Sequence, residues 1–219
     1  LSESPELAEA CASENILFIG PTPDLLRRLG DKVEARALAV AAGVPVLPAT
    51  GPVPRTAAKA AAMAVEIGYP IMVKASWGGG GRGMRVVREA SALETEVDAA
   101  RREARAAFGK DEVFFEKLVE RARHIEVQIL GDSKGNVCHL YERDCTVQRR
   151  HQKIIETAPA VGLSTDTREA LLAAALRLAE HAGYLNAGTV EFLFDTDSGE
   201  FYFIEVNPRI QVEARKSVV

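Results

Sequence analysis

The chain begins with short apolar runs separated by helix and turn signals. Residues 15–20 form an apolar run that ends at a glycine, which predicts a buried strand followed by a turn. A helix is predicted next, because Thr22 is a favourable cap and Pro23 suits the first helical position. Asp31 and Glu34 have the spacing of a capping box and predict the start of a second helix.

Helix and strand signals then alternate around a loop rich in glycine. The pattern predicts a helix over residues 56–67, a strand over 71–73, the loop at 78–83, a helix over 91–107 and a strand over 113–116. These elements predict a small lobe near residues 46–118.

From His124 onward the apolar period changes to two, as in a strand. One predicted face holds Ile125, Val127 and Ile129, and the other holds His124, Glu126 and Gln128. Residues 137–141 are predicted to pair back after a turn at 131–136.

The last third of the chain predicts a long helix and a second hairpin. Asp166 with Glu169 predicts the start of the helix, and Gly183 predicts its end. Residues 189–194 and 201–207 predict the two strands of the hairpin. The predicted fold class is therefore α+β, with the small lobe inserted into a larger one.

Composition adds little to the fold but excludes some functions. The chain has 219 residues, of which 47% are apolar, and its net charge is 27 − 31 = −4. A negative balance argues against a protein that coats nucleic acid. We expect no membrane span, because no run approaches roughly 18 apolar residues. The three cysteines (Cys11, Cys138 and Cys145) form no CxxC pair, which argues against a zinc site.

The glycine-rich loop is the first candidate site. Lys74 ends an apolar strand just before it, where a charge is otherwise poorly placed. Backbone without side chains can approach a polyphosphate closely. The spacing is neither a Walker A motif nor a dinucleotide fingerprint, so a flexible loop and a phosphate loop stay equal alternatives.

The last hairpin predicts a metal site. Thr189, Glu191 and Leu193 are expected on one face of the first strand, and Phe201, Phe203, Glu205 and Asn207 on one face of the second. A register that pairs residues summing to about 396 brings Glu191 opposite Glu205. Opposed carboxylates destabilise a sheet unless a cation lies between them, and oxygen ligands favour Mg²⁺ or Mn²⁺. The alternative is a solvated acidic face.

Two further segments carry charges suited to small anions. Four basic or titratable residues fall within five positions, at Arg149, Arg150, His151 and Lys153. They predict a phosphate or bicarbonate pocket, with a solvated loop as the equal alternative. In 209–213, Arg209 and Glu213 flank Gln211 at alternate positions, and could hold an oxyanion and take its proton. The alternative is an exposed ion pair of little energetic value.

Together these motifs resemble the biotin carboxylase family of ATP-grasp enzymes. The stretches that carry the resemblance are 74–85 (KASWGGGGRGMR), 142–153 (ERDCTVQRRHQK) and 203–213 (FIEVNPRIQVE). Trp77 and the Glu-Val-Asn-Pro wording are most similar to the pyruvate carboxylase branch. The resemblance implies an ATP-grasp fold divided into the end of an N-terminal subdomain (1–45), a lid (46–118) and an incomplete C-terminal subdomain (119–219).

The resemblance also implies a role for each matching residue. ATP phosphates would be bound by Lys32, Lys74, Gly79, Gly80 and Gly81, and the adenine pocket lined by Glu116, Lys117 and Val119. His124, Gln148 and His151 would approach the ribose and phosphates, and Lys153 the transferring phosphate. Glu191, Glu205 and Asn207 would hold Mg²⁺ or Mn²⁺. Arg209, Gln211 and Val212 would cradle bicarbonate, and Glu213 would deprotonate it.

The implied reaction is the ATP-dependent carboxylation of protein-linked biotin by bicarbonate, through carboxyphosphate. The implied partners are a biotin carboxyl carrier domain and a carboxyltransferase domain of the parent protein, in a homo-oligomer, with no nucleic acid and no membrane. The implied compartment is the cytoplasm, or the mitochondrion in a eukaryote, and sparse cysteines fit a reducing compartment.

One segment departs from the family pattern. The family continues after Gln-Val-Glu with His-Thr-Val-Thr-Glu, whereas this chain continues with 214–219 (ARKSVV). We therefore expect a chain truncated at both ends. The alternatives are the biotin carboxylase of an acyl-CoA carboxylase, a carbamoyl-phosphate-type ligase and an inactive nucleotide-binding fragment.

Overall fold

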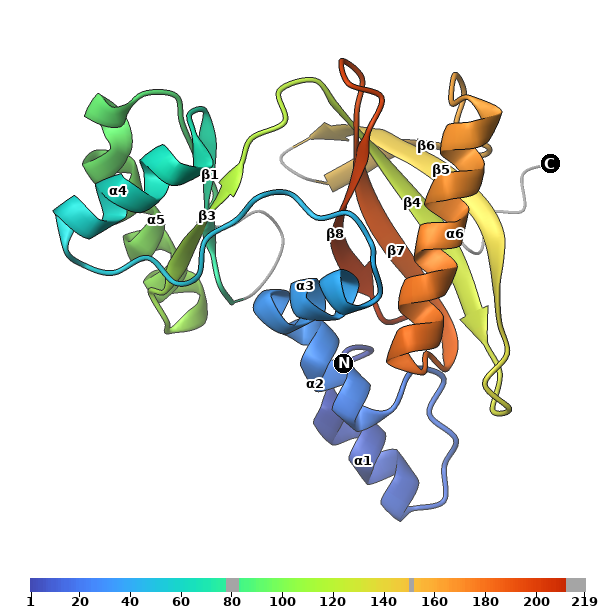
Figure 1. The fold of residues 1–219 in the computed structure, drawn as a ribbon. Helices are drawn as coiled ribbons and strands as arrows, with labels where there is room; N and C mark the ends of the chain where they lie inside the picture. The colour runs from blue at the N-terminus through green and yellow to red at the C-terminus, as the bar shows by residue number, and fades with distance from the viewer. Residues whose placement is uncertain (78–82, 150–151, 212–219) are drawn as a thin grey trace. The chain divides into compact units, whose positions relative to one another are not determined.

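The computed structural model describes residues 1–77, 83–149 and 152–211, which form two compact units. The first unit holds residues 1–46, 121–149 and the chain from 153 onward, and the second is built on 47–120. Residues 1–46 thus belong to the same unit as the C-terminal half. The α+β class is confirmed by the helices and the two sheets (Figure 1). None of the helices in the described part is long and apolar enough to cross a membrane.

The second unit is a three-stranded antiparallel sheet packed against helices. Its elements are α4 (Ala57–Ile67), β1 (Ile71–Ala75), β2 (Arg85–Val87), the 3₁₀ helix η1 (Ala90–Ala92), α5 (Leu93–Phe108) and β3 (Val113–Lys117), with strand order β2-β1-β3. Alternate residues such as Ile71, Val73 and Phe115 are wholly buried in its core. The intervening positions, which include Lys74 and Glu116, therefore lie on the other face of the sheet.

The first unit contains a five-stranded sheet in the order β6-β5-β4-β7-β8. Its elements are α1 (Pro5–Ser13), α2 (Pro23–Gly30), α3 (Lys32–Ala41), β4 (Ala122–Gly131), β5 (Val137–Arg149), β6 (Gln152–Thr157), α6 (Thr165–Ala182), β7 (Asn186–Asp195) and β8 (Phe201–Asn207). Helix α6 packs on β4 and β5, and α2 and α3 contact β8 (Figure 1). The core lies under these helices, so the other sheet face is available for polar side chains.

Most predicted helix boundaries are confirmed, because they depend on local caps. Thr22 accepts a hydrogen bond from Leu25 N, and Asp31 accepts from the backbone N–H groups that open α3. The cap predicted for α6 was wrong, since Ser164 accepts from Thr167 N and Asp166 lies inside the first turn. Gly183 ends α6, as predicted, and it does so in the left-handed conformation.

The predicted strand over residues 15–20 was wrong. Asn15 has a φ of 55° and its N–H bonds to Ala12 O, while Ile16 N bonds to Cys11 O at 2.8 Å. These are the bonds of a Schellman motif that closes α1, a helix that the sequence interpretation missed. The run cannot enter a sheet while its backbone ends this helix, and Leu17 is 86% exposed.

The predicted register of the last hairpin was confirmed where the carboxylates lie. Glu191 pairs with Glu205, which sums to 396. A bulge then places Phe192 opposite Phe203 and leaves Ile204 as the extra residue. The bulge turns Phe203 into the core, so the prediction that Phe201 and Phe203 share a face with Glu205 was wrong.

The strand after the first hairpin turn is longer than predicted. β5 runs to Arg149, whereas the sequence interpretation ended it at Tyr141. Tyr141 has a φ of 62° at a register shift, and the pairing with β4 resumes at Glu142. The segment from Glu142 to Arg149 is therefore a strand and not a loop; Glu142 and Cys145 are buried in it, whereas Arg149 is exposed.

Candidate functional site

A row of charged side chains crosses four neighbouring strands of the first unit. Arg143 on β5 lies directly opposite Glu126 on β4, Glu126 opposite Glu191 on β7, and Glu191 opposite Glu205 on β8. Because side chains alternate along a strand, this row lies on the face away from the core. Carboxylates opposite one another destabilise a sheet. The opposed carboxylates of this row therefore need cations beside them to offset their repulsion.

Glu126 lies inside this row and is completely buried (0% exposed). One carboxylate oxygen accepts a hydrogen bond from Nε of Arg143 at 2.5 Å, and the other accepts one from Nζ of Lys153. A buried carboxylate is costly unless it is paired and hydrogen-bonded. The two cations, from β5 and β6, meet this requirement.

Lys153 connects two of the opposed carboxylates. Besides Glu126, its Nζ donates to Oε1 of Glu191 at 3.0 Å and to Oε1 of Gln211 at 3.5 Å. Burial would lower the pKa of Lys153, but the carboxylates of Glu191 and Glu126 outweigh burial and raise it. The ammonium group therefore stays charged at neutral pH.

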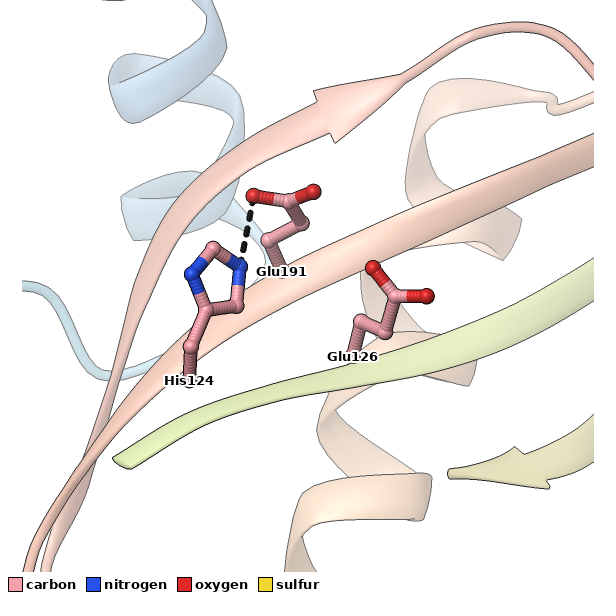
Figure 2. A group of neighbouring side chains, drawn as sticks. All are labelled: His124, Glu126 and Glu191. Atoms are coloured by element: carbon pink, nitrogen blue, oxygen red, sulfur yellow. Dashed lines mark ion pairs between the residues drawn. The ribbon is translucent and has the colours of Figure 1, made fainter. Parts of the chain in front are cut away.

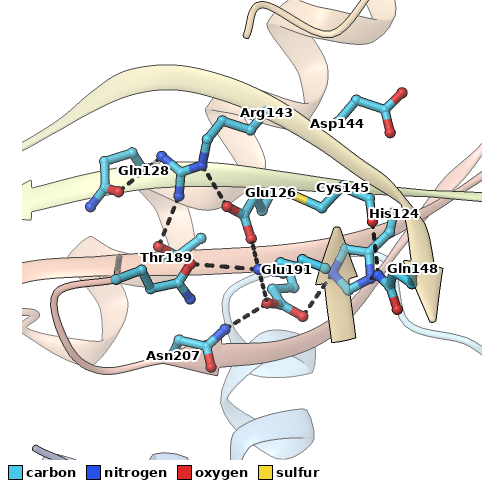
Figure 3. Close-up of polar contacts among 12 residues, drawn as sticks. His124, Glu126, Gln128, Arg143, Asp144, Cys145, Gln148, Thr189, Glu191 and Asn207 are labelled. Carbon is cyan, nitrogen blue, oxygen red and sulfur yellow. Dashed lines mark hydrogen bonds and ion pairs between the residues drawn. The ribbon is translucent and has the colours of Figure 1, made fainter. Parts of the chain in front are cut away.

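His124 is held in one tautomer by its neighbours (Figures 2 and 3). Nε2 of Gln148 donates to the carbonyl of Cys145 at 2.9 Å and lies 2.9 Å from Nδ1 of His124. Because this amide nitrogen is a donor, Nδ1 must accept, and the ring proton is on Nε2. That nitrogen faces Oε2 of Glu191 at 2.8 Å.

Glu191 is consequently the most heavily used carboxylate of the site. Burial would raise its pKa, but the contacts with His124 and Lys153 outweigh burial and hold the pKa of Glu191 below its usual range. Asn207 on β8 also donates to Oε1 of Glu191 at 2.6 Å. Glu191 therefore presents an ionised group at neutral pH, next to the facing residue Glu205.

Among the described residues, ligand atoms of His124, Glu126 and Glu191 lie within 4.8 Å of one another, a spacing that could hold a metal ion (Figure 2). Two observations argue against a metal between them. The proton on Nε2 of His124 removes its lone pair, and Lys153 already bridges the two carboxylates. The pair formed by Glu191 and Glu205, with the amide of Asn207, has the all-oxygen donors that Mg²⁺ prefers.

Lys74 and Glu116 form an ion pair in the second unit, and each side chain is 13% exposed. Lys117, one position further along β3, instead donates to the carbonyls of Gly68 and Tyr69 at 2.8 and 3.1 Å. Its ammonium group therefore serves the turn after α4. Val119 lies in the segment after β3 and is partly exposed.

Lys32 is the first residue of α3 in the first unit. Arg209 donates from Nε to Glu3 at 2.5 Å, so the structure joins it to the N-terminal segment. Gln211 is buried and contacts Lys153. The remaining predicted site residues lie outside the described residues: Gly79, Gly80, Gly81, His151, Val212 and Glu213.

Sequence reasoning gave no role to Glu126 or Arg143. Glu126 stood on the predicted polar face of its strand, between His124 and Gln128, which was the available signal. Arg143 stood in the charged segment that follows Tyr141. Their opposition depends on β4 and β5 pairing in one register, and the predicted strand ended before that register could be applied.

Most of the chain matches a known sequence family. Residues 31–217 match the family described as the ATP-binding domain of the carbamoyl-phosphate synthase L chain. The chain belongs to this ATP-binding family. The match covers most of the chain, including the strands of both sheets.

Among individual proteins, the chain is similar to pyruvate carboxylases. Pyruvate carboxylase 1 of Caenorhabditis elegans is 56% identical over 97% of this chain, which spans 18% of that protein. The structure of Rhizobium etli pyruvate carboxylase with acetyl coenzyme A is 62% identical, with a TM-score of 0.89 over 98% of this chain and 19% of that one.

A third relative has ligands in its structure. The biotin carboxylase domain of Hydrogenobacter thermophilus 2-oxoglutarate carboxylase is 43% identical, with a TM-score of 0.90 over 97% of this chain and 47% of that one, and was solved with MgADP, ADP and bicarbonate. These similarities show the ATP-grasp fold of biotin carboxylases. The chain spans about half of that domain and about a fifth of the pyruvate carboxylases.

Proposed function

We propose that this chain is the ATP-binding core of a biotin carboxylase within a pyruvate carboxylase. The observation that carries the proposal is the partly buried cation Lys153, held by Glu126 and Glu191 on a row that ends at Glu205. A fixed cation next to a pair of carboxylates suited to Mg²⁺ fits phosphoryl transfer, where catalysis is mainly positioning and charge neutralisation. The bicarbonate and MgADP of the Hydrogenobacter relative support this assignment.

The proposed nucleotide-binding residues are those that match the motifs of the family. Lys32 and Lys74 contact the phosphates with Gly79, Gly80 and Gly81, while Glu116, Lys117 and Val119 line the adenine pocket and His124, Gln148 and His151 approach the ribose and phosphates. Lys117 takes part through its backbone, since its side chain serves the turn after α4. In this proposal residues 1–45 are the end of the N-terminal subdomain and residues 46–118 are the lid. Residues 119–219 are the incomplete C-terminal subdomain.

The proposed chemistry has two stages. Arg209, Gln211 and Val212 hold bicarbonate, and Glu213 takes its proton while the oxygen attacks the γ-phosphorus of ATP and ADP leaves. The resulting carboxyphosphate separates into CO₂ and phosphate, and the phosphate takes the N1 proton of biotin as that nitrogen bonds to CO₂. Lys153 holds the transferring phosphoryl group in line.

Glu191, Glu205 and Asn207 would hold Mg²⁺, which would neutralise charge on the phosphates of ATP. The carboxylated biotin, on its carrier domain, then passes to a carboxyltransferase domain of the parent protein, in a homo-oligomer of the cytoplasm or the mitochondrion. The acceptor, pyruvate or an acyl-CoA, is selected by that other domain.

The direct test is ATP hydrolysis with and without bicarbonate, in the protein expressed with its native flanking sequence. We expect ADP release to require bicarbonate and to rise when free biotin is added. Nucleotide binding without bicarbonate-dependent hydrolysis would show the inactive fragment instead. Supplying pyruvate and acetyl-CoA in separate assays identifies the acceptor.

Lys74→Ala is expected to weaken ATP binding about tenfold to a hundredfold, the value of one charge-assisted contact of roughly 1.5–3 kcal/mol. The side chain lies away from the core of its unit, but it pairs with Glu116 and is only 13% exposed, so denaturant unfolding must accompany the binding measurement. Isothermal titration with ATP measures the loss. Arg85→Ala is the control, since Arg85 forms an exposed pair with Glu103 in the same unit. Unchanged affinity in a folded Lys74 variant would remove this lysine from the site.

A further inference from the structure

Arg143 uses its whole guanidinium group within the sheet. Nε donates to Glu126 at 2.5 Å, Nη1 to Oε1 of Gln128 at 3.1 Å and Nη2 to Oγ1 of Thr189 at 3.4 Å (Figure 3). These partners lie on β4 and β7, so one side chain spans three strands. Each of the three guanidinium nitrogens therefore donates to a side chain of the sheet, and only 13% of the Arg143 side chain is exposed.

Glu126 divides its two oxygens between Arg143 and Lys153. Lys153 in turn is shared between Glu126 and Glu191. A cation bound by Glu191 and Glu205 would compete with Lys153 for Glu191, because the cation and the Lys153 ammonium group are both positive and repel each other. Of the two carboxylates that bind Lys153, Glu126 would then be the one that still holds it in place.

We propose that Arg143 is a positioning residue that fixes Glu126, so that Glu126 keeps Lys153 aligned while Glu191 binds the metal ion. This inference rests on the proposed function. Arg143 acts by holding the far oxygen of Glu126 and by tying it to Gln128 and Thr189, which fixes the carboxylate plane. Its charge also remains next to the buried carboxylate when Lys153 turns toward a phosphate.

The first experiment measures bicarbonate-dependent ATP hydrolysis by Arg143→Gln. We expect kcat to fall about tenfold to a hundredfold, as for a catalytic group displaced by roughly 1 Å, with the KM for MgATP changed less than about threefold. Binding of Mn²⁺ in the presence of ADP, followed by electron paramagnetic resonance, should keep its affinity. A fall in that affinity as large as the fall in kcat would overturn the proposal.

A double-mutant cycle tests whether Arg143 acts through Glu126. In a Glu126→Gln background, Arg143→Gln should change kcat by less than about threefold, because the group it positions is already lost. The single variant Arg143→Gln leaves the buried Glu126 carboxylate without its arginine. The double variant removes that carboxylate charge as well, so it can still be measured if the single variant folds poorly. If the fall in kcat of the double variant equals the product of the falls in the two single variants, the proposal is contradicted.

The sheet offers a matched control on its other face. Glu142, next to Arg143 in the chain, is buried and accepts from Nε of Arg168 at 2.8 Å. Arg168→Gln breaks a comparable buried pair and should leave kcat unchanged even if it lowers stability. Arg143→Lys should recover part of kcat. Wild-type protein without bicarbonate-dependent hydrolysis would refute the proposed function, whereas active wild type with an equally active Arg143→Gln would refute this inference alone.

Discussion

Lys153→Gln is expected to lower kcat for bicarbonate-dependent ATP hydrolysis roughly 10²–10³-fold, the usual effect of removing one fixed group that stabilises developing charge. The lysine bridges Glu126 and Glu191, which orient its ammonium group before any ligand binds. Glutamine can donate a hydrogen bond from the same region but has no charge. Steady-state kinetics with saturating ATP and bicarbonate measures the loss.

This substitution also leaves two opposed carboxylates without the cation between them. Breaking a buried pair can cost about 3–5 kcal/mol, and the 19% exposure of the Lys153 side chain should reduce that cost. Denaturant unfolding is therefore needed beside the kinetics. Lys134→Gln, in the exposed turn between β4 and β5, is the control and should change neither quantity. A folded Lys153→Gln protein with normal kcat would show that this lysine does not contact the transferring phosphate.

Glu205→Gln is expected to weaken Mg²⁺-dependent nucleotide binding about tenfold to a hundredfold, because it removes one of two charged metal ligands. Its stability should be retained, since the change removes a negative charge directly opposite Glu191. Calorimetric titration with ADP, with and without Mg²⁺, separates the two effects. Only the titration with Mg²⁺ should change.

Asp197→Asn provides the control for this hairpin. Asp197 lies in its turn and forms an exposed pair with Arg121 at 3.1 Å, away from the carboxylate row. It should bind nucleotide as the wild type does. Intact Mg²⁺-dependent binding in Glu205→Gln would place the metal elsewhere.

The sequence by itself determined the features that depend on near neighbours along the chain. The caps at Thr22 and Asp31 and the end of α6 at Gly183 were predicted because each depends on residues a few positions apart in the chain. The opposition of Glu191 and Glu205 was also predicted, because a short turn fixes the register of a hairpin. These local rules gave the α+β class and the proposed metal ligands.

The tertiary structure decided what depends on residues distant in the chain. Whether residues 15–20 form a strand depended on a partner strand, and their backbone instead closes α1. The bulge at Ile204 followed from the need to bury both Phe203 and Val206 under the helices, which strict alternation cannot do.

The sequence predicted only some of the residues of the site. Arg143, Glu126 and Glu191 meet because β5, β4 and β7 are neighbours in the sheet, an order that no local pattern specifies. Lys153 then reaches this row from β6. The sequence determined which charged residues were available, whereas strand order decided which of them became buried together. Burial matters because it strengthens the interactions between their charges.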